Sequence, residues 1–239
     1  MIQCIATDLD RTLLRDDKSI SPFTQEVLAR CRARGVKLVF ATARPLEQIK
    51  ALCKSIPFDG AVTLNGGAVY AEGTYLHKVT FDPAAQEDML CMIASDKSVT
   101  RISGNCSAYQ AGGKVPHEPL SMISFRSPDP ALAKAIRAKY PGLTIYTTAE
   151  QSDLYDVAPP GATKWDSLQY LMRHWNIPAS EIAAFGDDLN DIEMLRNCGT
   201  GIAVANALEE VKAVANEVCG SNEEDGVARW ILSAVPQLK

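Results

Sequence analysis

Two aspartates, Asp8 and Asp10, follow directly on a short apolar run in the stretch IQCIATDLDRTLL at residues 2–14. A short apolar run that stops at polar residues is typical of a buried parallel strand. In an open α/β sheet, ligands bind at the carboxyl ends of the strands, and alternation returns Asp10 to the same side as Asp8. Two carboxylates this close repel unless they share a cation, so the pattern favours a divalent ion such as Mg²⁺. A strand followed by an acidic loop would look the same, and the rest of the chain must decide.

The composition is that of a soluble globular protein: 46% of the 239 residues are hydrophobic and 22% are charged. A formal net charge of −5 provides no basic surface for nucleic acid. The seven cysteines are scattered and form no C-x-x-C pair, which indicates reduced thiols rather than disulfides or a zinc site. No signal peptide and no apolar run of membrane-spanning length is visible. We therefore expect a cytoplasmic protein, a monomer or weak homodimer, that binds neither nucleic acid nor membranes.

Strand and helix patterns alternate in two parts of the chain but not in the part between them. Strand candidates lie at 2–7, 36–41, 60–64, 182–185 and 201–204, and we expect Ser21, Thr163 and Asn206 to cap helices that begin after them. This rhythm predicts an α/β fold with a doubly wound parallel-sheet core. Residues 81–158 lack the rhythm and predict an inserted α+β domain. The expected division is a core of residues 1–80 and 159–239 with an inserted domain of residues 81–158.

Polar clusters follow the predicted strands or open predicted helices at four places. They are Asp8 with Asp10, Thr42 with Arg44, Lys164, and the run GDDLND at 186–191. In a doubly wound sheet those strand ends meet at one crevice. Acidic clusters can hold Mg²⁺, and a hydroxyl, a cation and helix-start N–H groups can hold phosphate oxygens. A carboxylate beside a metal-bound phosphoryl group is a competent nucleophile, so the four clusters together predict phosphoryl transfer.

These motifs resemble those of the haloacid dehalogenase superfamily, and specifically its Cof-type phosphatases of subclass IIB, which carry a large C2 cap. The family's D-x-D-x-T-L matches DLDRTL at 8–13, and its second motif matches FATAR at 40–44. The third resembles GATK at 161–164, the fourth matches GDDLND, and segments 65–67 and 222–226 are also similar. The resemblance implies a Rossmann-like core with an inserted cap, a Mg²⁺ cofactor, and hydrolysis of small phosphorylated metabolites through an aspartyl-phosphate.

The resemblance also implies roles for the matched acidic residues. Asp8 is expected to attack phosphorus and to be one of the Mg²⁺ ligands. Asp10 is expected to bind Mg²⁺ through its backbone carbonyl and to act as general acid and then as general base. Asp187 supplies the remaining carboxylate to the metal, and Asp191 supports the metal's waters.

The remaining motif residues are expected to bind the phosphoryl group or support the site. Thr42 and Lys164 would hold phosphoryl oxygens, with Asn190 beside them, and Arg44 is expected to form an ion pair at the surface or toward the cap. Thr42 could instead cap the following helix. A lysine in the first turn of a helix is disfavoured by the helix dipole, which favours a functional role for Lys164. Arg11 departs from the family, which usually has glycine there.

The substrate stays open among sugar phosphates, nucleotides and cofactor phosphates such as pyridoxal phosphate. Cap residues available to contact it are Arg101, Tyr109, Lys114, His117 and Arg126. Two other functions fit parts of the pattern: a phosphomutase, which shares the chemistry, and a non-enzymatic phospho-receiver domain. The long insert and the complete GDDLND run argue against the receiver.

Overall fold

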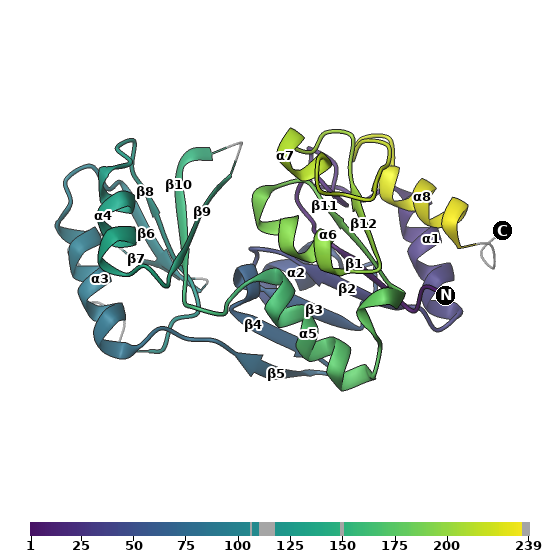
Figure 1. Ribbon diagram of the computed structural model, residues 1–239, viewed down its shortest axis with the longest axis horizontal. Helices are drawn as coiled ribbons and strands as arrows, with labels where there is room; N and C mark the ends of the chain where they lie inside the picture. Colours follow the sequence, from purple (N-terminus) through teal and green to yellow (C-terminus); the bar gives the residue numbers. More distant parts are fainter. Residues whose placement is uncertain (106, 110–117, 149–150, 236–239) are drawn as a thin grey trace.

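The computed structural model describes residues 1–105, 107–109, 118–148 and 151–235, and within them the chain forms two β-sheets, each with its own helices (Figure 1). The polypeptide passes between the two sheets at residues 79–82 and again at 159–163. Within the described residues, no helix is long and apolar enough to cross a membrane.

The larger sheet has, in the described residues, eight strands in the order β13-β12-β11-β1-β2-β3-β4-β5. They are β1 (Cys4–Thr7), β2 (Lys37–Ala41), β3 (Gly60–Thr63), β4 (Ala68–Ala71), β5 (Thr74–Lys78), β11 (Ile182–Gly186), β12 (Thr200–Ala203) and β13 (Glu217–Val218). Pairing is parallel from β13 to β3 and antiparallel at β4 and β5. The chain moves outward from β1 to β3 on one side and from β11 to β13 on the other. The predicted doubly wound sheet is confirmed, and its strand order reverses between β1 and β11.

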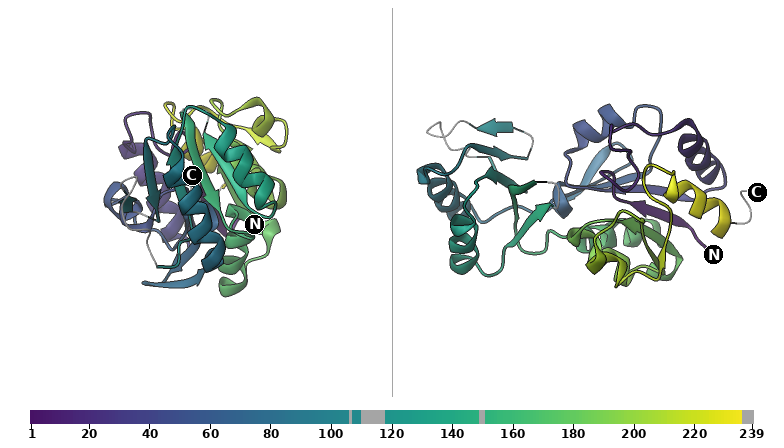
Figure 2. Two further views of the ribbon diagram at one scale, coloured as in Figure 1. Left: turned by 90° about the vertical axis from the view of Figure 1, so that its left-hand side faces the viewer. Right: turned by 90° about the horizontal axis from the view of Figure 1, so that it is seen from above.

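Helices cover both faces of this sheet, which is why β1 and β11 are buried along their whole length. The helices are α1 (Pro22–Ala33), α2 (Leu46–Leu52), α5 (Lys164–Trp175), α6 (Ile192–Asn197), α7 (Glu209–Lys212) and α8 (Gly226–Ala234). Figure 2 shows α1 and α2 on one side of the sheet and α5 and α6 on the other. Short 3₁₀ turns η1 (Leu64–Gly66), η2 (Ala179–Glu181) and η3 (Leu189–Asp191) complete the loops.

Two of the three predicted helix caps are confirmed and one is wrong. Ser21 accepts a hydrogen bond from Thr24 N at the start of α1, and Thr163 accepts one from Asp166 N at the start of α5. The cap position of α7 is Leu208, not Asn206. The Asn206 side chain is used in tertiary contacts instead: it donates to the Arg11 carbonyl at 2.7 Å and accepts from the backbone N of residue 222 at 3.0 Å. These bonds join the loop that follows β12 to the loops that follow β1 and β13.

The second sheet has, among the described residues, five antiparallel strands in the order β7-β6-β8-β10-β9. Its elements are α3 (Pro83–Ser95), β6 (Arg101–Gly104), β7 (Ser107–Tyr109), β8 (Ile123–Arg126), α4 (Ala131–Lys139), β9 (Thr144–Thr148) and β10 (Gln151–Ala158). Met89, Phe125, Ile136 and Val157 belong to a separate hydrophobic core that this sheet forms with its helices. Both helices cover the face turned away from the larger sheet (Figure 1). The other face is therefore directed toward the carboxyl ends of β1 and β2.

Gly66, in the turn after β3, lets this turn contact the start of α5. Its φ is +104°, and a Cβ built there would lie 2.3 Å from the Thr163 carbonyl oxygen. The Ser167 hydroxyl donates a hydrogen bond to the Gly66 carbonyl, so the contact is also bonded. Only glycine provides both the left-handed backbone and the space.

We predict that Gly66→Ala destabilises the fold more than Gly73→Ala does. Gly73 also has a positive φ, +85°, but no other atom lies within 4 Å of the place that a Cβ would occupy there. The left-handed backbone alone costs about 1–2 kcal/mol in the control, and the clash adds about 1–3 kcal/mol at Gly66. Urea unfolding of both variants measures the difference. Equal losses of stability would show that the backbone at Gly66 shifts freely.

Candidate active site

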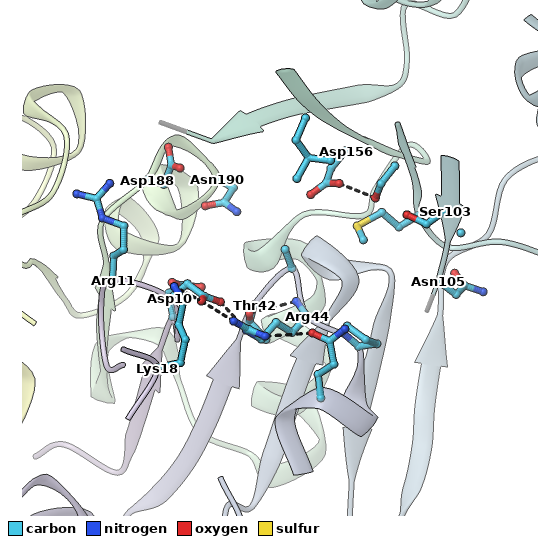
Figure 3. A pocket seen from close by; sticks show the side chains of 18 of the residues that line it. Asp10, Arg11, Lys18, Thr42, Arg44, Ser103, Asn105, Asp156, Asp188 and Asn190 are labelled. Carbon is cyan, nitrogen blue, oxygen red and sulfur yellow. Dashed lines mark hydrogen bonds and ion pairs between the residues drawn. The ribbon is translucent and has the colours of Figure 1, made fainter. Parts of the chain in front are cut away.

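The predicted site residues meet at the carboxyl ends of the central strands, where the strand order reverses. Asp8 follows β1 and Asp187 follows β11, which is its neighbour in the sheet, and Thr42 follows β2. Lys164 is the first residue of α5, and Asn190 and Asp191 lie in η3. Asp8, Thr42, Asp187 and Asn190 border a cavity of about 390 Å³ between the two sheets (Figure 3), whereas Lys164 and Asp191 do not belong to its lining. A volume of this size suits a small molecule.

Lys164 lies between two carboxylates and is almost completely buried. Its Nζ is 2.8 Å from Asp8 Oδ1 and 2.7 Å from Asp191 Oδ1, and the residue is 1% exposed. Burial by itself would lower the pKa of Lys164, but the two carboxylates outweigh it and raise this pKa. A charged lysine at a helix start is disfavoured by the dipole, so these ion pairs are what hold it there.

Asp8, Asp187 and Asp191 form a buried acidic cluster whose carboxylate oxygens lie within 4.8 Å of one another. Burial, with repulsion from the neighbouring carboxylates, raises the pKa values of Asp8 and Asp187. Lys164 is the buried cation beside them, whereas the partly exposed Arg11 approaches Asp187 only to 3.9 Å. Among the described side chains the cluster therefore keeps excess negative charge. A divalent cation with oxygen ligands fits this donor set.

The three carboxylates are not equally available to a metal. Asp191 binds Lys164 through Oδ1 and the backbone N–H groups of Asp187 and Asp188 through Oδ2. It shapes the 186–191 loop and does not line the cavity, whereas Asp8 and Asp187 do. Asp187 also accepts a hydrogen bond from the Thr12 hydroxyl at 2.8 Å, which orients it. Asp8 and Asp187 are thus the carboxylates that could hold a metal at the cavity.

Asp10 also lines the cavity, but its carboxylate is held by two cations. Arg44 binds it with two nitrogens, at 2.6 Å and 2.7 Å, and Lys18 lies 3.0 Å away. Partial burial raises the pKa of Asp10, but the hydrogen bonds from Arg44 and Lys18 outweigh it and hold this pKa below its usual range. Arg44 therefore forms its ion pair with Asp10, at the wall of the cavity.

Asn65 is a site residue to which the motifs assigned no role. Its backbone is left-handed, with φ 54°, and its Oδ1 accepts a hydrogen bond from Asn190 Nδ2 at 2.9 Å. Its Nδ2 faces the Asp156 carboxylate in β10 at 3.5 Å. Asn65 thus joins the η3 loop to the second sheet. The sequence signal for it was the segment Asn-Gly-Gly after a strand, because asparagine and glycine tolerate positive φ.

Thr42 and Asn190 differ in what they offer to a phosphoryl group: the Thr42 hydroxyl can still donate its proton, whereas the unpaired amide atom of Asn190 is an acceptor. Thr42 is buried, and its hydroxyl oxygen accepts a hydrogen bond from Arg44 N at 3.2 Å. Asn190 uses its Nδ2 for Asn65, while its buried Oδ1 has no hydrogen-bond partner among the described residues. In this arrangement Asn190 offers an acceptor to the cavity, whereas ionised phosphate oxygens need donors.

The residue at position 11 has φ 61°, a conformation that favours glycine. This explains why the related motif usually carries glycine there. The Arg11 side chain lines the cavity and donates to the Asn206 carbonyl at 3.3 Å, so it narrows the site at one side.

The predicted cap residues divide into three groups. Arg101 lines the cavity, and Arg126 pairs with Asp153 at 2.7 Å. Tyr109 lies in β7, and Lys114 and His117 lie outside the described residues.

Comparison with known proteins agrees with this geometry. A family described as haloacid dehalogenase-like hydrolase matches residues 5–127 and 114–231. The chain is 27% identical to 5-amino-6-(5-phospho-D-ribitylamino)uracil phosphatase YitU of Bacillus subtilis, covering 95% of each protein. It is 26% identical to pyridoxal phosphate phosphatase YbhA of Escherichia coli, covering 96% of this chain and 97% of YbhA. The solved structure of BT1666 from Bacteroides thetaiotaomicron has the same fold, with a TM-score of 0.85 at 22% identity, over 99% of this chain and 96% of that one.

We predict that Lys164→Met destabilises the protein by about 3–5 kcal/mol in metal-free buffer, because Asp8 and Asp191 would remain buried without their counter-ion. Lys212→Met is the matched control, since Lys212 is partly exposed and its ion pair is with the exposed Glu209, and we expect a change within about 0.5 kcal/mol. Urea unfolding measures both. A Lys164→Met protein as stable as the parent would contradict the assignment of Lys164 as the charge-balancing residue.

Proposed function

The chain belongs to the haloacid dehalogenase-like hydrolases and is a phosphatase of that family, and from this premise we propose that it is a Mg²⁺-dependent phosphomonoesterase that forms an aspartyl-phosphate on Asp8. The family match confirms the resemblance that the motifs indicated, and it excludes the alternative of a non-enzymatic receiver domain. Hydrolysis is favoured over a phosphomutase because relatives that match along almost their whole length are named phosphatases. The buried cluster of Asp8, Asp187 and Asp191 around Lys164 is the observation that carries the proposal.

The proposed reaction has two steps. First, a carboxylate oxygen of Asp8 attacks phosphorus, the bond from phosphorus to the leaving oxygen breaks, and Asp10 gives its proton to that oxygen. Then water attacks phosphorus, Asp10 takes a proton from the water, and the bond between phosphorus and Asp8 breaks. The products are an alcohol and inorganic phosphate.

Asp10 needs a different environment in each step. Arg44 and Lys18 stabilise its ionised form, which is the form required of a base in the second step. As an acid in the first step it must be protonated, so its bonds to Arg44 and Lys18 must open when substrate binds. Their location on the cavity wall allows the substrate to cause this exchange.

Lys164 favours the ionised form of Asp8, against the effect of burial, and fixes its position, as a nucleophile requires. Thr42 is available at the end of β2 to donate its hydroxyl proton to a phosphoryl oxygen. Asp8, Asp187 and the backbone carbonyl of Asp10 would hold Mg²⁺. When bound, Mg²⁺ neutralises the charge that develops on the phosphoryl oxygens.

We assign residues 81–158 as a cap domain on a core of residues 1–80 and 159–239. The helix-free face of its sheet forms one wall of the cavity, which supports a role in excluding water and selecting the leaving group. A cavity of about 390 Å³ between two walls favours small phosphorylated metabolites over polymers. The six cysteines in the described residues are free thiols, which supports a cytoplasmic location.

We predict that p-nitrophenyl phosphate is hydrolysed with Mg²⁺ present and that a chelator removes the activity until Mg²⁺ is restored. Asp8→Asn lowers kcat by at least about 10⁴-fold, because the amide cannot act as the nucleophile. Asp129→Asn is the control: Asp129 is exposed and lies outside the cavity lining, so we expect this variant to retain activity. Activity without divalent metal, or normal turnover by Asp8→Asn, would refute the mechanism.

We also predict that Asp10→Asn accumulates the covalent intermediate. p-Nitrophenolate leaves without protonation, so Asp8 still becomes phosphorylated, while loss of the base slows the second step by about 10²–10⁴-fold. Acid quenching and intact-protein mass spectrometry detect one added phosphoryl group. The double variant Asp8→Asn with Asp10→Asn should carry none. An adduct that persists in the double variant would place the phosphoryl group on another residue.

A further inference from the structure

The second sheet presents two chemically different faces, set by alternation along its strands. Ile102, Phe125 and Val157 point toward α3 and α4 and are buried in their hydrophobic core. Ser103, Ser124 and Asp156 point the opposite way and line the cavity. The alternation thus directs a set of polar side chains at the space above the phosphoryl site.

Ser103, Ser124 and Asp156 form a continuous row across three neighbouring strands. The register pairs Ser103 of β6 with Ser124 of β8, and Ser124 with Asp156 of β10. Directly paired side chains on one face of a sheet lie within about 5.5 Å of one another at Cβ. Figure 3 shows Ser103 and Asp156 on the wall of the cavity that faces Asp10 and Thr42. We call these three residues the polar row.

The polar row is built around a buried carboxyl group, that of Asp156, and burial raises the pKa of this group. Asp156 is 7% exposed, and its Oδ1 accepts a hydrogen bond from the Ser124 hydroxyl at 2.6 Å. Its other oxygen faces Asn65 Nδ2 at the long distance of 3.5 Å. A carboxylate removed from water needs strong donors, and a single hydroxyl with one long amide contact leaves acceptor capacity unused.

The described lining of the cavity contains no aromatic side chain on which an aromatic ring could stack. Its apolar lining consists of Ala43, Pro45, Met122 and Leu154, and no Phe, Tyr, Trp or His is among the described residues of the lining. Sites that hold a base or another flat ring use aromatic side chains for this purpose. The described walls instead consist mainly of hydrogen-bonding groups.

We propose that the polar row binds hydroxyl groups of the leaving alcohol, so that the preferred substrates are phosphates of sugars or other aliphatic polyols and not of aromatic compounds. Substrate hydroxyls exchange hydrogen bonds with the Asp156 carboxyl group and with the two serines. A leaving group without hydroxyls leaves these buried groups desolvated and unpaired, which is the arrangement that rejects an analogue most effectively. The inference rests on the proposed phosphatase activity and adds the class of its substrate.

The first test compares two six-carbon substrates that differ in hydroxyl content, and a third that carries an aromatic ring. Hexitol 6-phosphate, n-hexyl phosphate and pyridoxal phosphate are assayed with the parent enzyme and Mg²⁺. We expect kcat/KM for the hexitol phosphate to exceed that for n-hexyl phosphate by roughly 100-fold or more, and to exceed that for pyridoxal phosphate. Equal or better turnover of either hydroxyl-free or aromatic substrate overturns the inference.

The second test locates the preference in the polar row. Asp156→Asn and Ser124→Ala should each lower the ratio of kcat/KM for hexitol phosphate to kcat/KM for n-hexyl phosphate by about tenfold. Ser127→Ala is the matched control: its hydroxyl contacts Ser98 and the Asp129 carbonyl outside the cavity, so the ratio should not change. If the ratio in Asp156→Asn and in Ser124→Ala equals the ratio in the parent enzyme, the inference is overturned.

The outcomes also separate this inference from the function on which it rests. If p-nitrophenyl phosphate is hydrolysed but the polyol phosphate is not preferred, the phosphatase assignment stands. The polar row is then not the site that selects the leaving group. Absence of turnover of every substrate refutes both. If Asp156→Asn fails to fold in a thermal unfolding assay, Ser124→Ala and the parent substrate panel still decide the question.

Discussion

The ammonium of Lys164, placed between Asp8 and Asp191, is the interaction on which the rest of the site depends. It brings together the end of β1, the start of α5 and the η3 loop, which are far apart in the sequence. These groups are almost completely buried, so removal of either the ammonium or a carboxylate would leave a buried charge uncompensated. The same contacts that stabilise this part of the fold therefore hold Asp8 in place and favour its ionised form against the effect of burial. They also leave the cluster with excess negative charge, and this is the physical argument for a divalent cation.

A second constraint comes from the turn after β3. Leu64 and Asn65 both have left-handed backbones, and Gly66 packs against the backbone of Thr163, so this turn is defined by close contact with the start of α5. The strained backbone presents the Asn65 amide between Asn190 and Asp156. Through it, the loop that carries Asp187 is linked to the wall of the cavity contributed by the second sheet. Residues that bear strain at such a position are typically supported by several neighbouring elements.

In the proposed mechanism the Asp10 carboxyl group takes part in two opposite proton transfers. Arg44 and Lys18 favour its charged form, and both lie on the cavity wall where an incoming anion competes for them. The D-x-D spacing did not predict these two ion pairs of Asp10. Lys18 comes from the loop after β1 and Arg44 from the loop after β2. The prediction for Asn206 was wrong for a similar reason: its side chain bonds to backbone groups in the loops after β1 and β13, and this tertiary requirement outweighs its preference for a helix cap.

By itself, the sequence determined the doubly wound fold, the strand ends at which the acidic residues appear, and the caps at Ser21 and Thr163, because periodicity and local hydrogen bonding act over a few neighbouring residues. It also identified Asp8, Asp187 and Lys164, since their motifs are contiguous. Only the tertiary structure decided which carboxylates face the cavity, that Asp191 orders a loop, and that Asn65 and Asp156 belong to the site. Those outcomes depend on contacts between residues far apart in the chain, such as Asn65 with Asp156 or Thr12 with Asp187. Such contacts are set by the packing of whole sheets and helices, which no local pattern encodes.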